Sequence, residues 1–410
     1  MGVRERGAML IDRVALPAAR IRLAGREHRW WIVVLGVYAA SRVFTTTVML
    51  TLYIAATAGD WHFASSRVDP TFFTFSGSWD SSYYRQIAEH GYPHLPTDNT
   101  GNVVQNPWAF LPLFPLIARG LMFVTGLGFY PAGVIVAVVF GAAATLVLYR
   151  LVASRVGQTS GLWAAIFFSF GPLSFVLQIA YAESLFFFLM FAALWAMMSR
   201  HYWWVIPLGV AAALTRPGEL ALPLALGIVF VVRVVRQRRS VEPFPWRERV
   251  AMIVAGAVTA LAGFAWPLIA SAVTGVADAY LQTELSWWTG FVGQVSFVPL
   301  TPWFLFAWKF ASVVGAVLVV CAIAAFAWLL SRPSIRALGT EVVAYSASYG
   351  LYLLAVFLPQ ESLFRLLMPL YPLAGAPALT LDRRARLIVL FSGIALQPVA
   401  LFLLWYLGYP

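Results

Sequence analysis

Four charged side chains stand out in a chain that is otherwise mostly apolar, and their types favour one kind of chemistry. They belong to Asp80, Glu183, Arg216 and Arg365. A charge inside a membrane is costly and marks a functional site by default. Arginine binds phosphate through paired hydrogen bonds, and one carboxylate can deprotonate an attacking hydroxyl. The set predicts sugar transfer from a lipid-linked sugar phosphate, since that leaving group needs no acid, whereas glycoside hydrolysis needs two carboxylates.

The expected roles divide between one catalytic residue and a binding set. Asp80 is expected to be the general base that deprotonates the acceptor hydroxyl as it attacks the anomeric carbon. Substrate and donor-phosphate binding are expected of Arg216, Arg365, Glu183, Tyr181, Tyr84, His90 and Trp79. No histidine has a metal-ligand spacing with a partner, so no metal and no other cofactor are expected.

Each charged residue also has a structural interpretation. Asp80 precedes two serines and could be the N-cap of a helix, and Glu183 could cap the helix that it begins. Arg216 and Arg365 could extend to the outer headgroups of the membrane. However, Arg216 belongs to the helix-breaking segment Arg216-Pro-Gly218. Irregular backbone at membrane depth is tolerated only where it lines a cavity.

Asp80 lies in the aromatic, half-polar segment 77–93. As a helix over 80–90, this segment has an apolar side with Tyr83, Tyr84, Ile87 and Ala88 and a polar side opposite. Such an amphipathic helix lies in the plane of the membrane interface rather than crossing the bilayer.

The composition defines the class of protein. Of the 410 residues, 61% are hydrophobic and 11% are charged, and the mean hydropathy is +0.79. A soluble domain has about 25% charged residues, so the chain is an all-α polytopic membrane protein. The net charge of +11 is clustered in short loops between apolar segments, which fits cytoplasmic anchoring rather than nucleic-acid binding. The single cysteine, Cys321, excludes an internal disulfide and a thiolate metal cluster.

About eleven transmembrane helices are predicted within a single domain, 30–410, that follows a basic cytoplasmic N-terminus, 1–29. In chain order they are 30–56, 131–151, 161–179, 182–198, 203–215, 219–235, 250–273, 303–330, 342–358, 364–381 and 387–407. The first outer loop, 57–128, carries the Asp80 helix, and the second outer loop is 274–302. The proline-rich run 108–120 is predicted to be a second interfacial helix, because every later basic cluster then falls on the cytoplasmic side.

Several blocks of sequence resemble the PIG-V-type mannosyltransferases, the family of GPI mannosyltransferase II and its bacterial relatives in the GT-C superfamily. The blocks are Trp79-Asp80 with Ile87-Ala-Glu-His-Gly-Tyr92, the proline-rich run 106–115, 172–184 with Tyr181-Ala-Glu-Ser184, Leu214-Thr-Arg216, and 364–372. The resemblance implies a GT-C fold with horizontal helices in the first outer loop and a catalytic aspartate at Asp80. It also implies a polyprenyl-phosphate-mannose donor, an α-linked product and no nucleotide sugar. Pro217-Gly218 departs from the Ser-Asn of the family.

The leading hypothesis is therefore an inverting mannosyltransferase, a multi-pass protein of the cell membrane with its active site on the periplasmic or extracellular side. Its partners would be a polyprenyl-phosphate-sugar donor, a lipid or glycan acceptor and membrane lipids, with no nucleic acid and no protein partner. A transporter or flippase of a lipid-linked sugar could use the same arginines, but would show related halves with broken helices in both, and no repeat is found. A membrane scaffold would leave the charged residues without a reason to converge.

Overall fold

The computed structural model describes residues 20–23, 26–66 and 69–408. It begins with an antiparallel hairpin of β1 (Arg20–Leu23) and β2 (Arg26–Arg29). Apart from this hairpin and one isolated bridge, the described residues form helices and loops. The predicted N-terminal segment 1–29 lies largely outside the described residues, which include only its last part.

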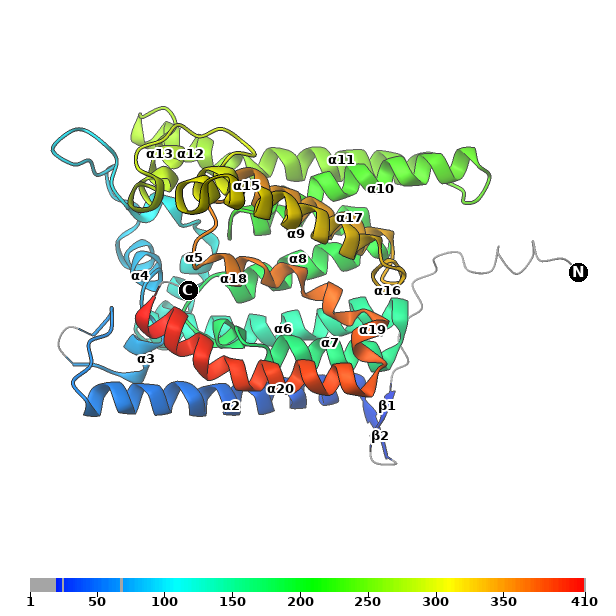
Figure 1. The fold of residues 1–410 in the computed structure, drawn as a ribbon, viewed down its shortest axis with the longest axis horizontal. Coiled ribbons are helices and arrows are strands. Elements are labelled where there is room, and N and C mark those ends of the chain that lie inside the picture. Colours follow the sequence, from blue (N-terminus) through cyan, green and yellow to red (C-terminus); the bar gives the residue numbers. More distant parts are fainter. Residues whose placement is uncertain (1–19, 24–25, 67–68, 409–410) are drawn as a thin grey trace, which may run out of the picture.

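Five helical stretches of the described chain are long and apolar enough to cross a membrane. They are α2 (Trp30–Ala58), α6 (Phe129–Val156), α11 with α12 (Trp246–Gly263 and Ala265–Thr274), α15 (Pro302–Ser331), and α20 (Arg383–Ala400) with the π-helical segment η4 (Leu401–Leu407). They run along the long axis of the molecule (Figure 1). The protein is an all-α multi-pass membrane protein, as the composition predicts.

Five further helices in the described residues complete the bundle. They are α7 (Gln158–Phe170), α8 (Glu183–Met198), α9 (Tyr202–Ala213), α10 (Ala221–Arg238) and α17 (Thr340–Val356). Almost every side chain of α8 is buried, as expected of a helix that is apolar all round. The core is therefore centred on the helix that begins with Glu183.

Two of the predicted spans are broken by 3-10 segments. The predicted helix 161–179 ends at Phe170, and a 3-10 segment, η2 (Ser174–Gln178), follows it. The predicted helix 364–381 is divided into α18 (Leu363–Leu366), the 3-10 segment η3 (Met368–Gly375) and α19 (Pro377–Thr380). Prolines cause both breaks, because proline cannot donate a helical hydrogen bond and disfavours helical geometry in the preceding residue.

Short elements from both predicted outer loops gather at one end of the bundle, the left end in Figure 1. They are α3 (Phe72–Phe75), α4 (Ser81–His90), η1 (Pro107–Ala109), α5 (Leu113–Thr125), α13 (Ala279–Ser286) and α14 (Thr289–Val292). The bounds of α4 agree with the predicted helix 80–90. The first outer loop packs against α12, which leads into the second outer loop, through the rings of Tyr92, Trp108 and Trp266. The Trp266 indole donates to the Trp108 carbonyl at 3.0 Å.

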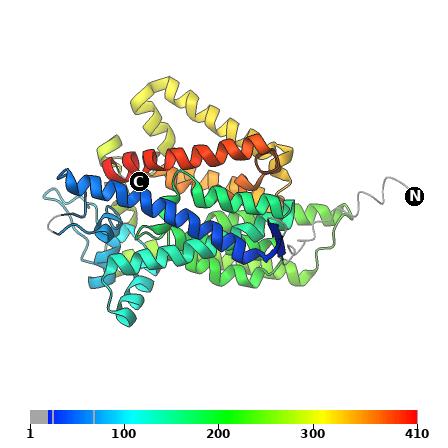
Figure 2. The same cartoon turned by 90° about the horizontal axis from the view of Figure 1, so that it is seen from below.

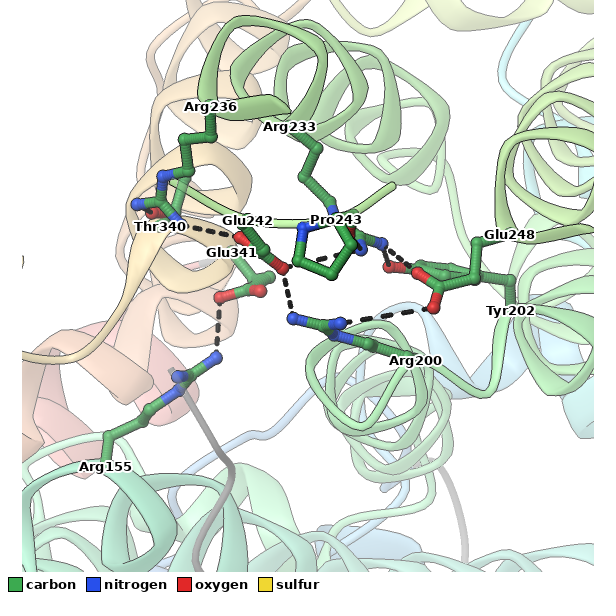
Figure 3. A network of polar contacts seen from close by, with 10 residues as sticks. All are labelled: Arg155, Arg200, Tyr202, Arg233, Arg236, Glu242, Pro243, Glu248, Thr340 and Glu341. Atoms are coloured by element: carbon green, nitrogen blue, oxygen red, sulfur yellow. Dashed lines mark hydrogen bonds and ion pairs between the residues drawn. The ribbon is translucent and has the colours of Figure 1, made fainter. Parts of the chain in front are cut away.

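The opposite end, where α16 (Pro333–Arg336) lies, is held by a network of ion pairs (Figure 3). Arg155 Nη2 lies 2.8 Å from Glu341 Oε2, which joins α6 to α17. Arg236 Nη2 donates to Thr340 Oγ1 at 3.0 Å, which joins α10 to α17. The remaining pairs join Arg200 and Arg233 each to Glu242 and Glu248, and Arg236 to Glu242. The network fastens four helices, α6, α10, α11 and α17, together at the end far from the outer loops.

One apolar helix stands apart from the others. Figure 2 shows α15 arching away from the bundle. Only 11% of the residues in its most apolar 18-residue stretch are buried. The helix is kinked at Ser312, whose φ is 48°. Its exposed apolar side chains would contact lipid, since hydrocarbon is their natural solvent in a membrane.

Candidate functional site

The four charged residues singled out in the sequence meet at the end of the bundle that carries the outer loops. Arg365 joins the two acids: its Nη1 lies 2.6 Å from Glu183 Oε1 and its Nη2 lies 2.6 Å from Asp80 Oδ2. Arg216 Nη1 lies 2.5 Å from the same Glu183 oxygen. Residues from α4, α8, α18 and the turn after α9 thus form one charged cluster.

The structural interpretations of Asp80 and of the two arginines are wrong, whereas Glu183 stands at the start of its helix as well as in the cluster. Asp80 is the N-cap residue of α4, but its side chain makes no capping hydrogen bond and pairs with Arg365 instead. Glu183 begins α8, and its Oε1 accepts from both arginines. The side chains of Arg216 and Arg365 are 12% and 9% exposed, so neither extends toward headgroups. The Asp80 side chain is 19% exposed, which leaves it within reach of a bound molecule.

The loop before α4 is held in one conformation by contacts from distant parts of the chain. Trp79 has a φ of 56°, a strained geometry of the kind found at functional sites. Its indole donates to the Trp405 carbonyl of η4 at 2.7 Å, and the Trp405 indole donates to the Phe75 carbonyl at 3.1 Å. Gly77 is required here, because a Cβ would lie 2.0 Å from the Tyr130 ring. The C-terminal segment therefore fixes the loop that presents Asp80.

Tyr181 and Tyr84 lie against the charged cluster. The backbone N–H of Asp80 donates to the Tyr181 hydroxyl at 3.1 Å, and the Arg365 guanidinium lies 5.2 Å from the centre of the Tyr181 ring. Tyr84 packs edge-on against Tyr181, with ring centres 6.4 Å apart. Both rings are buried, so they contact the charged residues from the protein side.

The structure does not bring His90 to the cluster. It is the last residue of α4, and a ten-residue helix separates its ends by about 15 Å. The imidazole Nε2 lies 3.9 Å from Glu89 Oε2, and its side chain is 77% exposed. Trp79 adjoins the cluster, and its indole N–H is used to hold the loop.

Arg216 is positioned by the break that the sequence predicts after a short helix. The helix α9 ends at Ala213, and Gly218 has a φ of 117°. The Leu214 carbonyl accepts a hydrogen bond from the Leu113 N–H at 2.9 Å, which ties this turn to the start of α5. The irregular backbone is thus buried against protein, as it must be at this depth.

The sequence analysis missed Glu284, in α13 of the second outer loop. The pKa of its carboxyl is raised to about 7, mainly by burial. The Asp80 charge also raises this pKa, whereas a hydrogen bond from Tyr280 and the Arg216 charge oppose the rise. Glu284 therefore lies within the field of the charged cluster. Asn106 Nδ2 donates to Thr283 Oγ1 at 3.1 Å and docks α13 on the first outer loop. An acid in an apolar, aromatic loop was the signal that could have identified it.

Glu284 should make the stability of the protein depend on pH. A carboxyl whose pKa is raised by folding gives stability that is complete below its ordinary pKa and is lost as pH rises through the raised value. We expect this group to lower the free energy of unfolding by about 2 kcal/mol between roughly pH 5 and pH 8. Denaturant titrations at the two pH values measure the effect.

Glu284→Gln should remove this part of the pH dependence. Glu89→Gln is the matched control, because Glu89 lies on the exposed side of α4 and should leave the dependence as in the wild type. Equal slopes for the wild type and Glu284→Gln would contradict the raised pKa of this carboxyl.

The charges of the cluster suit binding of an anion. Two arginines face two carboxylates, so an added phosphate competes with a carboxylate for a guanidinium. Within residues 20–23, 26–66 and 69–408, no group of three His, Cys, Asp or Glu side chains could hold a metal ion. What the cluster offers is bidentate arginine for phosphate and a carboxylate beside it.

No protein-family model matches the chain, and no curated protein sequence matches it. Among solved structures it is similar to ArnT from Cupriavidus metallidurans bound to undecaprenyl phosphate, with 13% identity, a TM-score of 0.47 and coverage of 88% of this chain and 62% of ArnT. For apo ArnT the identity is 16%, the TM-score 0.42 and the coverage 84% and 62%. For the oligosaccharyltransferase AglB from Archaeoglobus fulgidus, in complex with an inhibitory peptide and a dolichol-phosphate, these are 12%, 0.47, 91% and 56%. The chain thus spans less than two thirds of the length of each of these proteins.

Proposed function

We propose that the protein is a membrane glycosyltransferase of the GT-C class. It would transfer a mannosyl residue from polyprenyl-phosphate-mannose to a lipid or glycan acceptor, with inversion at the anomeric carbon. The observation that carries the proposal is Arg365, which contacts Asp80 and Glu183 at the same time. A guanidinium for phosphate and a partly exposed carboxylate for a proton then stand side by side, which is what this reaction needs.

The proposed reaction uses the ion pair between Asp80 and Arg365 as its starting point. The donor phosphate takes the place of the Asp80 carboxylate on Arg365, and Arg216 offers a second guanidinium. Asp80 is then free to accept the proton of the acceptor hydroxyl. The hydroxyl oxygen forms a bond to the anomeric carbon, the bond from that carbon to the phosphate oxygen breaks, and polyprenyl phosphate leaves with its new negative charge held by the arginines.

The distribution of arginines supports placement of the site on the outer face. The end opposite the charged cluster carries the network of Arg155, Arg200, Arg233 and Arg236 (Figure 3). The first turn of α20, residues 383–386, carries three arginines at the same end (Figure 1). Cytoplasmic loops are enriched in arginine and lysine, so the charged cluster would face the periplasm or the cell exterior.

The resemblance to the PIG-V-type mannosyltransferases supports the choice of sugar. The blocks that carry it contribute Asp80, Tyr181, Glu183, Arg216 and Arg365, which are the residues of the charged cluster and its tyrosine. The segments that carry the resemblance are far apart in the sequence, and these residues from them lie together in the structure.

Reconstituted protein supplied with labelled polyprenyl-phosphate-mannose should release polyprenyl phosphate and label a lipid or glycan fraction. GDP-mannose, which lacks the polyprenyl chain, should not serve as donor, and polyprenyl-phosphate-glucose tests the preference for mannose. Transfer from GDP-mannose alone would overturn the proposal. Transfer from the glucose donor alone would retain the reaction and correct the sugar.

A flippase for the same lipid is the second candidate, because the bundle carries a cluster of ion pairs at each end. Alternating access requires each end to open in turn, whereas a transferase can keep the cytoplasmic end closed. We expect Arg155→Cys with Glu341→Cys, joined by a short bis-maleimide in a Cys321→Ala background, to retain transfer. The uncrosslinked double variant is the control. Loss of function only after cross-linking would favour the flippase.

A further inference from the structure

Arg42 is a buried charge that the proposed reaction does not use. It lies in α2, about 18 Å along the helix from Trp30 at 1.5 Å per residue, and is 8% exposed. No carboxylate pairs with it in the part of the chain that the structure describes. A charged side chain at such depth is costly and calls for a function.

The guanidinium of Arg42 binds backbone carbonyls at the break between α7 and η2. Its Nη1 donates to the Ser174 carbonyl at 2.7 Å, and its Nη2 donates to the Ser169 carbonyl at 3.0 Å. Its Nη1 also lies 3.3 Å from Gln178 Oε1. Carbonyls at the end of a helix have no partner within that helix, and an unsatisfied carbonyl in a membrane is expensive. Arg42 therefore makes this break in the helix possible.

A second polar side chain holds the same break from another helix. Gln397 of α20 donates from Nε2 to the Gly171 carbonyl at 3.4 Å and also to the Ser174 hydroxyl. Thr45, one turn after Arg42 in α2, donates to Gln397 Oε1 at 3.3 Å. The helices α2 and α20 thus fix segment 171–182, which is not α-helical.

This segment leads directly to the charged cluster. Tyr181 follows η2 after two residues, and its hydroxyl accepts from the Asp80 N–H. The Ala180 carbonyl accepts from the Ser81 hydroxyl at 2.8 Å, and the Ala180 N–H donates to the Ser76 carbonyl at 3.1 Å. The conformation of the break therefore determines where Asp80 is held.

We infer that Arg42 is a positioning residue for the site, acting through segment 171–182 on Asp80. Its role in transfer rests on the proposed function, but its effect on the segment does not. If these carbonyls lost their donors, segment 171–182 would shift to satisfy them, and Tyr181 and Ala180 would move relative to the Asp80 loop. The charge of Arg42 stabilises the broken form, since a charged donor makes stronger hydrogen bonds to carbonyls than a neutral one.

Arg42→Met should lower kcat about 10²-fold, because a displacement of about 1 Å at a catalytic group has an effect of this size. The KM for donor should change less than about threefold, since Arg216 and Arg365 stay paired with Glu183. Arg42→Lys should restore part of kcat. Arg155→Met is the control: it removes a buried ion pair at the opposite end and should lower Tm with unchanged kcat per folded protein.

Hydrogen exchange provides a readout that needs no substrate. In Arg42→Met, amides of segments 171–182 and 77–82 should both exchange faster than in the wild type, and in Arg155→Met neither should. If Arg42→Met does not fold, Gln397→Met is measured in the same way, with the same direction expected. Unchanged exchange at 77–82, or a kcat equal to that of Arg155→Met, would overturn the inference. Faster exchange in Arg42→Met, together with no transfer by the wild type, would overturn the proposed function alone.

Discussion

Asp80→Asn is expected to lower the rate of sugar transfer by about 10²–10⁴-fold, the usual contribution of a general base. The amide has nearly the same shape but cannot accept the proton of the acceptor hydroxyl. Binding of polyprenyl phosphate should not fall, and should become tighter, because Asp80 no longer competes for Arg365. Single-turnover rates and equilibrium binding of polyprenyl phosphate measure the two effects separately.

Glu89→Gln is the matched control for Asp80→Asn. Glu89 lies on the same helix but pairs with Arg85 near the surface, with a distance of 3.6 Å between Glu89 Oε2 and Arg85 Nε. This change should leave both rate and binding as in the wild type. A near-normal rate for Asp80→Asn would remove Asp80 from the reaction, and weaker binding would contradict the competition for Arg365.

Arg365→Met is expected to have the second large effect, on stability as well as on transfer. The change removes the partner of Asp80 and one partner of Glu183. Removing one member of a buried ion pair costs about 3–5 kcal/mol, because the other charge stays buried without compensation. Transfer should fall below detection, since the donor phosphate loses the arginine that also releases Asp80. Denaturation midpoints and the transfer assay test both expectations.

A double variant separates the two effects of Arg365→Met. Adding Asp80→Asn removes one uncompensated carboxylate, so part of the stability should return while transfer stays absent. Arg85→Met is the control, because exposed ion pairs contribute about 0–1 kcal/mol. A destabilisation no larger than that of Arg85→Met would show that the Arg365 pairs are not buried in the way described.

The residues of the charged cluster could be predicted because charge is rare in this chain. Hydropathy and the positions of the basic clusters place Asp80, Glu183 and Arg216 on the same, outer side. The sequence Arg216-Pro-Gly218 itself predicts a break in the helix. The helix α4 follows from its amphipathic pattern. Such features depend on local sequence and on the membrane as solvent, so one chain is enough to find them.

Other features depend on contacts that local sequence does not encode. Hydropathy cannot distinguish an α-helix from the 3-10 segment of η2, because both are apolar, and the partner that permits the break, Arg42, is over 120 residues away. His90 was expected at the cluster because its motif includes Asp80, but the length of α4 separates them. The position of Glu284 near the charged cluster could not be predicted from the sequence, because it depends on how the two outer loops dock.

The contacts of Trp405 have a consequence for the biogenesis of the protein. Membrane proteins are synthesised from the N-terminus, and early segments fold before later ones are made. The indole and carbonyl of Trp405 that hold the Asp80 loop lie 326 residues after Trp79 in the sequence. During synthesis the loop therefore lacks these two hydrogen bonds until η4 has been made. The final conformation of an early loop thus depends on a segment that enters the membrane much later.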